Sequence, residues 1–357
     1  MNLPELRAEI DNIDNQLLWL LGERAALVHE IGTIKKNAGT EIYSPEREQQ
    51  LLDSLIERSE GRLTPESLRA IYREIMSASL ALEKGIAIAY LGPEGTWTHQ
   101  AAREKFGASV SYLPESDIGD VFNEVARRHA DYGVVPVENS TEGAVNHTLD
   151  MFMESDLKIC AQILLRIDNH LIGNGRRESI ARIYSHPQVF GQCRAWLQRE
   201  MPAVELIEVS STTRAAERAA RETDGAALAG RMAAEVYRLS ILQRSVQDDP
   251  HNTTRFLVIG QQSCPRTGND RTSLMFGLRD EPGALFAALQ PFDQFKLNLN
   301  KIESRPSRRK SWEYFFFVDV EGHQDDEAVQ TVVNALKKSC SVVKILGSYP
   351  NAERQSQ

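Results

Sequence analysis

Apolar side chains recur at helical spacing along the first part of the chain. Between residues 4 and 36 they return every three or four positions, from Leu6 and Ile10 to Ile31 and Ile34. A helix of about 32 residues is roughly 48 Å long, which exceeds what one small domain covers with its own chain. We therefore predict that a partner chain covers this helix.

Two further helices are predicted by their start signals. Ser44 and Thr64 are each followed by a proline, which is the pattern of an N-cap residue with proline at the first helical position. Apolar residues at helical spacing follow both signals. Residues 1–85 are therefore predicted to form an all-helical domain of three helices.

The periodicity changes after Gly85. Short apolar runs typical of buried strands then alternate with helical stretches. The runs are 86–91, 132–139, 160–167, 181–186, 226–230 and 255–260, and helical stretches include 100–106, 194–200 and 213–221. This alternation predicts parallel α/β layers, arranged as two lobes with a cleft, and we place this domain at 86–265.

A third pattern follows a linker rich in turn-forming residues. Between residues 271 and 349 the order reads strand, helix, strand, strand, helix, strand, which is the ferredoxin-like βαββαβ arrangement. Pro291 should kink or end the first of these helices. The predicted architecture is multidomain, with the last domain at 270–351.

Composition and charge disfavour several classes of protein. The chain has 357 residues and a net charge of −9, which argues against a general binder of nucleic acid or anionic lipid. The four cysteines are scattered and read as reduced thiols. There is no apolar run of membrane-spanning length and no secretory signal, so the cytoplasm is the expected location. Neither H-E-x-x-H nor G-x-G-x-x-G occurs, so we expect no metal and no nucleotide cofactor.

Cations along the first predicted helix could hold an anionic ligand. Arg24 and Lys35 are eleven residues apart and project from one helix face, whereas Arg7 lies roughly 100° round the helix. Arg7 could reach the same ligand only from another chain, as in a swapped dimer. Ser79 and Glu83 lie one turn apart on the third helix. From spacing alone, solvated helix charges are favoured by roughly three to one.

The motifs of this segment closely resemble those of the all-helical (AroQ-type) chorismate mutases. The resemblance is carried, in order, by LRAEIDNIDNQLLWLLGERAALVHEIGTIKK, SPEREQQLL and ASLALEK. It implies that the substrate-binding cations are Arg24, Lys35 and Arg47, with Arg7 donated by the other subunit. It also implies that Glu48, Ser79 and Glu83 contact the hydroxyl and ether oxygens of the substrate. Ser44 departs from the family, which often has an acid there.

The rearrangement of chorismate to prephenate is intramolecular and needs no nucleophile. The protein must hold two carboxylates in a folded conformer and stabilise charge on the breaking ether oxygen. Lys35 supplies charge, and Glu83 can donate a hydrogen bond to that oxygen only while protonated, which calls for a buried position.

The middle segment resembles prephenate dehydratases in five ordered motifs, LGPEGTWTHQAA, VVPVENSTEGAVNHTLD, YSHPQVFGQC, SSTTRAAERAA and HNTTRFLVIG. By resemblance, Thr254 is the candidate donor at the departing ring hydroxyl and Arg255 a candidate clamp for a substrate carboxylate. Further residues implied to line the site are Thr96, Thr98, Asn139, Ser140, Ser185 and Gln192. A structural reading remains, in which residues 138–141 form an N-cap cluster.

The last segment resembles the ACT regulatory domains attached to prephenate dehydratases. In that family two motifs flank a phenylalanine at a dimer interface, and here they are Gly283, Ala284 and Leu285 together with Glu303, Ser304, Arg305 and Pro306. The resemblance implies a sensor of phenylalanine, and the alternative is a simple dimerisation module.

Together the three resemblances imply the bifunctional chorismate mutase/prephenate dehydratases. The expected activity converts chorismate to prephenate and prephenate to phenylpyruvate, with loss of CO2 and water and with feedback inhibition by phenylalanine. The expected assembly is a homodimer or a higher homo-oligomer. An arogenate-using dehydratase and a non-catalytic sensor of aromatic amino acids or small anions are the alternatives.

Overall fold

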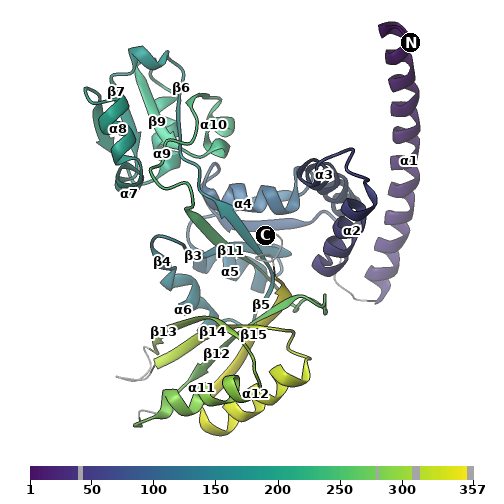
Figure 1. Cartoon of the computed structure of the whole chain (residues 1–357), viewed down its shortest axis with the longest axis vertical. Helices are drawn as coiled ribbons and strands as arrows, with labels where there is room; N and C mark the ends of the chain where they lie inside the picture. The colour runs from purple at the N-terminus through teal and green to yellow at the C-terminus, as the bar shows by residue number, and fades with distance from the viewer. Residues whose placement is uncertain (39–42, 279–280, 308–313, 352–357) are drawn as a thin grey trace. The chain divides into compact units, whose positions relative to one another are not determined.

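The computed structural model describes the chain except for residues 39–42, 279–280, 308–313 and 352–357 (Figure 1). It contains two compact units. The first comprises Met1–Ala87 with Phe106–Ser111, and the second comprises Ile88–Lys105 with Tyr112–Gln357.

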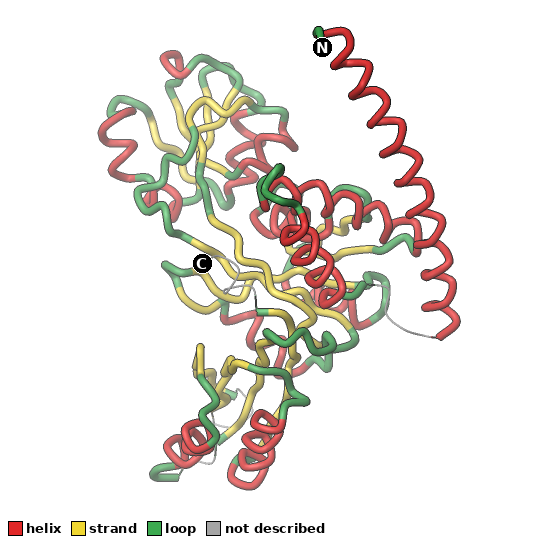
Figure 2. The backbone as a smooth tube through the Cα atoms, turned by 45° about the vertical axis from the view of Figure 1, so that its right-hand side comes forward, coloured by secondary structure: helices red, strands yellow, loops and turns green. Residues whose placement is uncertain are grey.

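The first unit contains the three helices expected from the sequence, α1 (Leu3–Ala38), α2 (Pro45–Arg58) and α3 (Pro65–Glu83). Proline opens α2 and α3 as predicted, and the Thr64 side chain accepts a hydrogen bond from the backbone N–H of Ser67. Only Val28 and Gly32 of α1 are buried, and Figure 2 shows this helix as one uninterrupted rod. At 1.5 Å per residue its 36 residues span about 54 Å.

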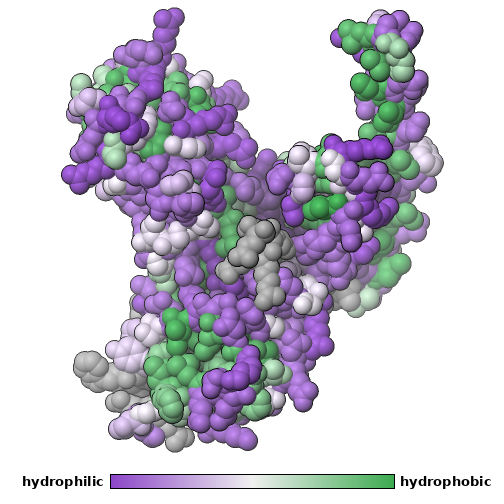
Figure 3. All heavy atoms as spheres, in the orientation of Figure 1, coloured by the Kyte–Doolittle hydropathy of each residue, from purple (hydrophilic) through white to green (hydrophobic). Residues whose placement is uncertain are grey.

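Apolar side chains are exposed along most of α1, where Figure 3 shows them in green. These exposed residues are Leu3, Leu6, Ile10, Ile13, Leu17, Leu18, Trp19, Leu20, Leu21, Leu27, Ile31 and Ile34. A contiguous apolar surface of this length marks an interaction site, because monomeric proteins rarely leave one in water.

Two sheets follow in the second unit. The first has the order β2-β1-β3-β11-β5, with β4 paired to β3, and the second has the order β10-β6-β9-β7-β8. The strands of the first sheet are β1 (Ala87–Leu91), β2 (Ser111–Glu115), β3 (Tyr132–Asn139), β4 (Gly143–Ala144), β5 (Lys158–Arg166) and β11 (Thr253–Gly260). Those of the second are β6 (His170–Gly173), β7 (Arg182–Ser185), β8 (Glu205–Glu208), β9 (Gly225–Ala229) and β10 (Ser240–Gln243).

Helices accompany both sheets. Those of the first sheet are α4 (Trp97–Phe106), α5 (Ile118–Ala126) and α6 (Asn146–Glu154). Those of the second are α7 (Pro187–Gln192), α8 (Arg194–Glu200), α9 (Thr212–Ala219) and α10 (Arg231–Tyr237). α4, α8 and α9 match the helical stretches named from the sequence, and the other four were not named there.

The prediction of parallel layers is wrong for part of both sheets. β1 pairs parallel with β3, and β7 pairs parallel with β8 and β9. In contrast, β11 runs antiparallel to both β3 and β5, and β6 runs antiparallel to β9 and β10. The reason is the path of the chain, which leaves the first sheet along β5 and returns to it along β11. The chain re-enters beside the point where it left, since the N–H of Ile167 bonds the carbonyl of Asn252, so β11 runs back antiparallel to β5.

The C-terminal sheet confirms the predicted βαββαβ order. Its strands are ordered β13-β14-β12-β15 and are antiparallel. The elements are β12 (Asp270–Gly277), α11 (Ala284–Gln294), β13 (Leu299–Pro306), β14 (Tyr314–Glu321), α12 (Glu327–Ser339) and β15 (Val342–Pro350). Pro291 lies inside α11, which ends three residues later.

The two faces of the C-terminal sheet have different partners. Leu274, Phe276 and Val318 share a core with Phe292 of α11 and Leu336 of α12. Residues of the opposite face, including Met275, Phe317 and Leu346, belong to the core of the first sheet instead. The C-terminal sheet is therefore covered by its own helices on one face and by the first sheet on the other. In the described part of the chain, no helix is long and apolar enough to cross a membrane.

Candidate functional sites

Two pairs of predicted site residues meet where α1 lies against α3. Nη1 of Arg24 donates a hydrogen bond to Oγ of the buried Ser79, which in turn donates to the carbonyl of Ile75 at 2.8 Å. Eleven residues along α1, Nζ of Lys35 lies 3.6 Å from Oε2 of Glu83. The predicted face of α1 therefore carries both cations toward α3.

Glu83 has little contact with solvent at the end of α3. Its side chain is 9% exposed, and Oε2 accepts no hydrogen bond from the residues that the structure describes. Gly32 makes this approach possible, because a Cβ atom there would lie 3.0 Å from Cγ of Glu83. A carboxyl oxygen without a bound donor is available to a ligand that meets α1 and α3 at this point.

The other predicted mutase residues lie at the start of α2 and in the N-terminal turns of α1. Arg47 is exposed at the start of α2, and the neighbouring Glu48 accepts a hydrogen bond from the hydroxyl of Tyr43 at 3.1 Å. Ser44 bonds Glu46 and makes no side-chain cap. Arg7 is exposed, and the 17 residues that separate it from Arg24 place it about 26 Å away along α1. One chain does not bring Arg7 to the other cations.

Asn139 and Thr254 come together in the first sheet. They face each other in the pairing of β3 with β11, and Nδ2 of Asn139 donates to Oγ1 of Thr254 at 2.7 Å. Oδ1 of Asn139 accepts from the backbone N–H of Thr141 at 2.9 Å, which fixes the orientation of the amide. Because the Thr254 oxygen accepts from Asn139, its own O–H is directed elsewhere and can donate to a ligand.

Asn252 joins this pair and was not singled out from the sequence. Its Oδ1 accepts from Nδ2 of Asn139 at 2.9 Å. Ser140, which was singled out, accepts a hydrogen bond from the backbone N–H of Thr253 at 3.0 Å. Asn252 stands two positions before Thr254 in the motif HNTTRFLVIG, so alternation along a strand was the available signal.

Four other residues predicted to line the dehydratase site make no hydrogen bond to Asn139 or Thr254 among the described residues. Thr96 Oγ1 donates to the carbonyl of Leu91 and accepts from the N–H of His99, and Thr98 is buried on α4. No hydrogen bond among the described residues joins either threonine to Thr254.

The remaining two lie in the second sheet's lobe. Ser185 is buried and donates to the carbonyl of Leu228 at 2.8 Å, so its hydroxyl is engaged between β7 and β9. Gln192 accepts from Nδ2 of Asn169 at 3.3 Å, and Asn169 is a second residue that the sequence did not single out. It stands directly between β5 and β6, where the chain passes from one sheet to the other.

Arg255 is placed differently from the expectation of a substrate clamp. Its guanidinium donates to Oδ2 of Asp319 at 2.6 Å and to the hydroxyl of Tyr349 at 2.7 Å. Ser273 completes the group, with Oγ 2.5 Å from Oδ1 of Asp319 and 2.6 Å from the Tyr349 hydroxyl. All four side chains are buried. The carboxylate that Arg255 holds therefore comes from β14 of the C-terminal sheet.

The charges of this buried group depend on one another. Burial alone would lower the pKa of Arg255 and raise the pKa of Asp319, but their ion pair outweighs burial. The pKa of Arg255 is raised and the pKa of Asp319 is lowered, so both stay charged. Burial also raises the pKa of Tyr349 to about 12, which keeps its hydroxyl protonated.

The two motifs of the C-terminal domain lie on α11 and β13. Gly283 has a φ of +82° immediately before α11, a conformation that suits glycine, and Ala284 and Leu285 begin the helix. Leu285 is 38% exposed and the neighbouring Phe286 is 76% exposed.

Side chains alternate along the second motif. Lys301, Glu303 and Arg305 are partly buried, whereas Ser304 and Pro306 are exposed. Arg305 pairs with Asp150 of α6 at 3.0 Å. This face of β13 therefore lies against the first sheet's layer.

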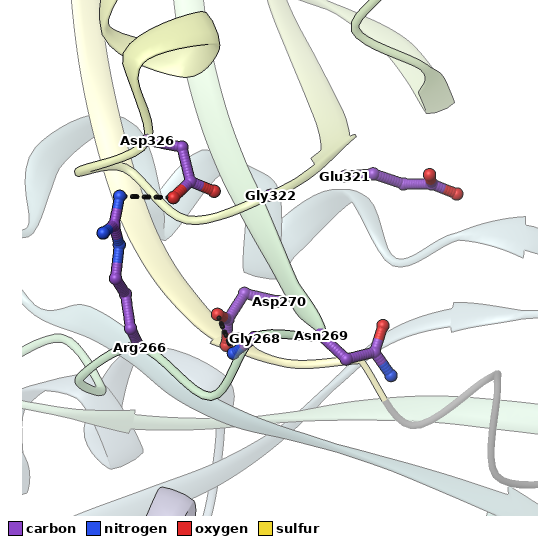
Figure 4. A pocket seen from close by; sticks show the side chains of 7 residues that line it. All are labelled: Arg266, Gly268, Asn269, Asp270, Glu321, Gly322 and Asp326. Carbon is purple, nitrogen blue, oxygen red and sulfur yellow. Dashed lines mark hydrogen bonds and ion pairs between the residues drawn. The ribbon is translucent and has the colours of Figure 1, made fainter.

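A cavity of about 320 Å³ lies elsewhere, at the ends of β12 and β14 (Figure 4). It is lined by Arg266, Gly268, Asn269, Asp270, Glu321, Gly322 and Asp326. Asp326 accepts from Arg266 and from the N–H of His323, and Asp270 accepts from the N–H groups of Thr267 and Gly268. Asp270 and Asp326 thus hold turns, and we assign no substrate to the cavity. Among the described residues, no group of three or more His, Cys, Asp or Glu could hold a metal ion.

Comparison with known proteins assigns a family to each segment. The family model of chorismate mutase type II matches residues 6–84, that of prephenate dehydratase matches 88–264, and that of the ACT domain matches 272–338. These matches occur in the order in which the structure presents the three-helix segment, the two sheets and the C-terminal sheet.

Whole-chain relatives agree with these matches. The chain is 50% identical over 355 residues to a bifunctional chorismate mutase/prephenate dehydratase of Aquifex aeolicus, covering 98% of both chains. It is 45% identical over 357 residues to the protein of that name from Pseudomonas aeruginosa, again covering 98% of both. Among solved structures, prephenate dehydratase of Arthrobacter aurescens in complex with L-Phe is 31% identical with a TM-score of 0.70. That match covers 76% of this chain and 92% of the other.

Proposed function

Because the chain belongs to the bifunctional chorismate mutase/prephenate dehydratases, we propose how its residues divide the work of the two reactions. The enzyme rearranges chorismate to prephenate and converts prephenate to phenylpyruvate with loss of CO2 and water. The first reaction is proposed to occur between α1 and α3, and the second beside Thr254.

In the mutase reaction, Arg24 and Lys35 bind the carboxylates of chorismate and hold its folded conformer. Lys35 and a protonated Glu83 stabilise the negative charge that develops on the ether oxygen. Support comes from Glu83 Oε2, which is buried 3.6 Å from Lys35 and without a hydrogen-bond donor among the described residues. Pre-positioned donors of this kind favour the transition state over the ground state.

We propose that a second copy of the chain completes the mutase site with its Arg7. Arg7 lies too far along α1 to reach Lys35 in its own chain. An antiparallel copy of α1 would carry the partner's N-terminal turns toward Arg24, and it would cover the exposed apolar side chains. The assembly is thus proposed to be at least a homodimer.

In the dehydratase reaction, Thr254 donates to the ring hydroxyl of prephenate as it departs. Asn139 positions the Thr254 oxygen by donating to it, and the low exposure of Thr254, 9%, limits competition from water. Threonine is a weak acid, so its contribution comes from position and desolvation. The substrate is proposed to be prephenate, with arogenate as the alternative at the same ring-side group.

The C-terminal domain is proposed to bind phenylalanine and to inhibit dehydration. Support comes from the Gly283–Leu285 and Glu303–Pro306 motifs, and from the L-Phe bound to the similar Arthrobacter aurescens protein. Inhibition requires that phenylalanine bind one global state better than another.

The observation that carries the proposal is the 2.7 Å contact between Asn139 and Thr254, which joins two motifs 115 residues apart. The test supplies purified protein with chorismate and follows prephenate and phenylpyruvate, with and without phenylalanine. We expect phenylpyruvate, in smaller amounts when phenylalanine is present. Prephenate alone would refute the dehydratase assignment, and no turnover would leave a binding protein. Turnover of arogenate but not prephenate would identify the alternative substrate.

A further inference from the structure

The strands that carry Asn139 and Thr254 carry a second matched pair on their other face. In the register of β3 and β11, Asn139 faces Thr254, and Glu138 faces Arg255. Successive side chains of a strand point to opposite faces of the sheet. The proposed catalytic pair and the Glu138–Arg255 pair therefore share backbone, one on each side.

The C-terminal sheet holds this second pair through all four of its strands. Asp319 of β14 and Tyr349 of β15 bind the guanidinium of Arg255, and Ser273 of β12 joins those two. Lys301 of β13 lies 2.8 Å from Oε2 of Glu138. Three strands thus contribute a side chain that contacts Arg255 or Glu138, and the fourth contributes Ser273, which links two of those side chains.

The hydrogen bonds of this group form a closed ring in which both paths start at Arg255 and end at Asp319. Arg255 donates to the Tyr349 oxygen, and the Ser273 hydroxyl donates to Asp319, so the Tyr349 hydroxyl is left to donate to Ser273. Asp319 accepts from Arg255 at its other oxygen and closes the ring. Nε of Arg255 has no hydrogen-bond partner among the described residues, but the two terminal nitrogens of its guanidinium are held in the ring. Because the four side chains are buried, displacing one of them leaves a buried polar group of its neighbour without a partner.

We propose that Asp319 and Lys301 are positioning residues for the dehydratase reaction, acting through Arg255 and Glu138 to hold Asn139 against Thr254. The inference rests on the proposed role of Thr254. Asp319 and Lys301 touch no substrate; they fix the backbone of β3 and β11 at the positions next to the reacting pair. Dehydration then depends on contacts supplied by the C-terminal sheet, whereas the mutase reaction does not.

The test compares dehydratase kcat and KM among variants of the full-length enzyme. Asp319→Asn removes the charge that holds Arg255, and Lys301→Gln removes the cation beside Glu138. Asp319→Glu is the conservative variant. Lys344→Gln is the matched control. Lys344 is also a lysine of the C-terminal sheet that contacts the first sheet's layer, but it donates to the carbonyls of Phe152 and Ser155 near the end of α6 and not to Glu138. Mutase turnover in the same samples is an internal control.

We expect Asp319→Asn to lower dehydratase kcat by roughly 10- to 100-fold, because small misplacements of reacting groups have effects of that size. Lys301→Gln should lower it less. KM and mutase turnover should stay within about twofold of wild type, and Asp319→Glu should restore part of the loss. Lys344→Gln should lower thermal stability while retaining kcat.

Three results would overturn the proposal. One is a folded Asp319→Asn enzyme with wild-type kcat. The second is an equal loss of kcat in Lys344→Gln, which would indicate general loosening of the interface. The third is a raised KM at unchanged kcat, which would mean that Arg255 binds substrate. If Asp319→Asn does not fold, Tyr349→Phe removes a single hydroxyl from the ring, and the same comparison is made with it.

Failure of this inference differs from failure of the proposed function. If Thr254→Ala dehydrates prephenate normally, the role of Thr254 is wrong. If Thr254→Ala is inactive while Asp319→Asn is fully active, only the positioning role is wrong.

Discussion

The helical unit and the first sheet present their functional groups in opposite ways. On α1, apolar side chains are exposed over most of its length, and Arg7 is too distant to reach Lys35 in the same chain. In the first sheet, Asn139, Thr254 and Arg255 find their partners within one chain. The difference teaches why we propose association of two chains for the mutase site, but contacts within one chain for the dehydratase site.

The largest expected effect concerns the self-contained site. Thr254→Ala should lower phenylpyruvate formation by about 10³-fold, within the range seen when a proton donor is removed, and mutase turnover should survive. Thr254→Ser keeps the hydroxyl and serves as the control. Both reactions are followed from chorismate in one sample. Loss of both activities would contradict the independence of the two regions.

The second prediction tests whether association completes the mutase site. Arg7→Ala and Lys35→Ala should each lower mutase turnover by roughly 10²-fold, because each removes a charge placed at the substrate. If Arg7 acts across a dimer, mixing the two variants under subunit exchange should restore about a quarter of the sites, since half of the dimers are mixed and each has one intact site. A mixture as inactive as its parents would place Arg7 outside the site.

A third prediction concerns Glu83. Glu83→Ala should lower mutase turnover by up to about 10²-fold, because it removes the group proposed to donate a hydrogen bond to the ether oxygen beside Lys35. Glu83→Gln keeps a donor at the same position and should retain most of the turnover, measured with chorismate at a single pH. A Gln variant as slow as the Ala variant would count against this role.

The smallest effect is on acid stability. The pKa of Asp319 is lowered in the folded protein, so its contribution to stability is present above the ordinary range of an aspartate and is lost as pH falls through the lowered value. Near neutral pH, breaking this buried pair should cost about 3–5 kcal/mol of unfolding free energy. The difference between wild type and Asp319→Asn in urea unfolding should shrink from pH 6 to pH 3. If the unfolding free energies of wild type and Asp319→Asn changed equally with pH, the lowered pKa of Asp319 would be contradicted.

Local patterns predicted the three helices of the first unit and the order of elements along the C-terminal domain. The starts of α2 and α3 were readable because proline at the first position is a local signal, although only Thr64 and not Ser44 caps its helix. The helix α1 was readable from its apolar spacing. The antiparallel placement of β11 was not, because a strand's neighbours depend on where the chain returns rather than on its own residues.

In the candidate sites, too, contacts set by local spacing were predictable and contacts between distant parts of the chain were not. The eleven-residue spacing of Arg24 and Lys35 predicted a shared face, and both meet α3. The partner of Arg255 could not be predicted, because Asp319 lies 64 residues away in sequence. The residues around an arginine in a strand do not indicate which distant carboxylate it will bind. Asn169 was missed because it lies between β5 and β6, outside the five motifs that resemble the prephenate dehydratases.

The passage of the chain between the two sheets has a consequence for how this domain could be rebuilt. Ile167 and Asn252 are neighbours, with the N–H of one bonded to the carbonyl of the other at 2.8 Å, although the whole second sheet lies between them in sequence. The lobe of the second sheet is thus an insertion between β5 and β11, two antiparallel strands that would otherwise form a hairpin, and its two ends lie side by side. Replacing it with a tight turn of about two residues should leave the host sheet able to close, which offers a minimal scaffold.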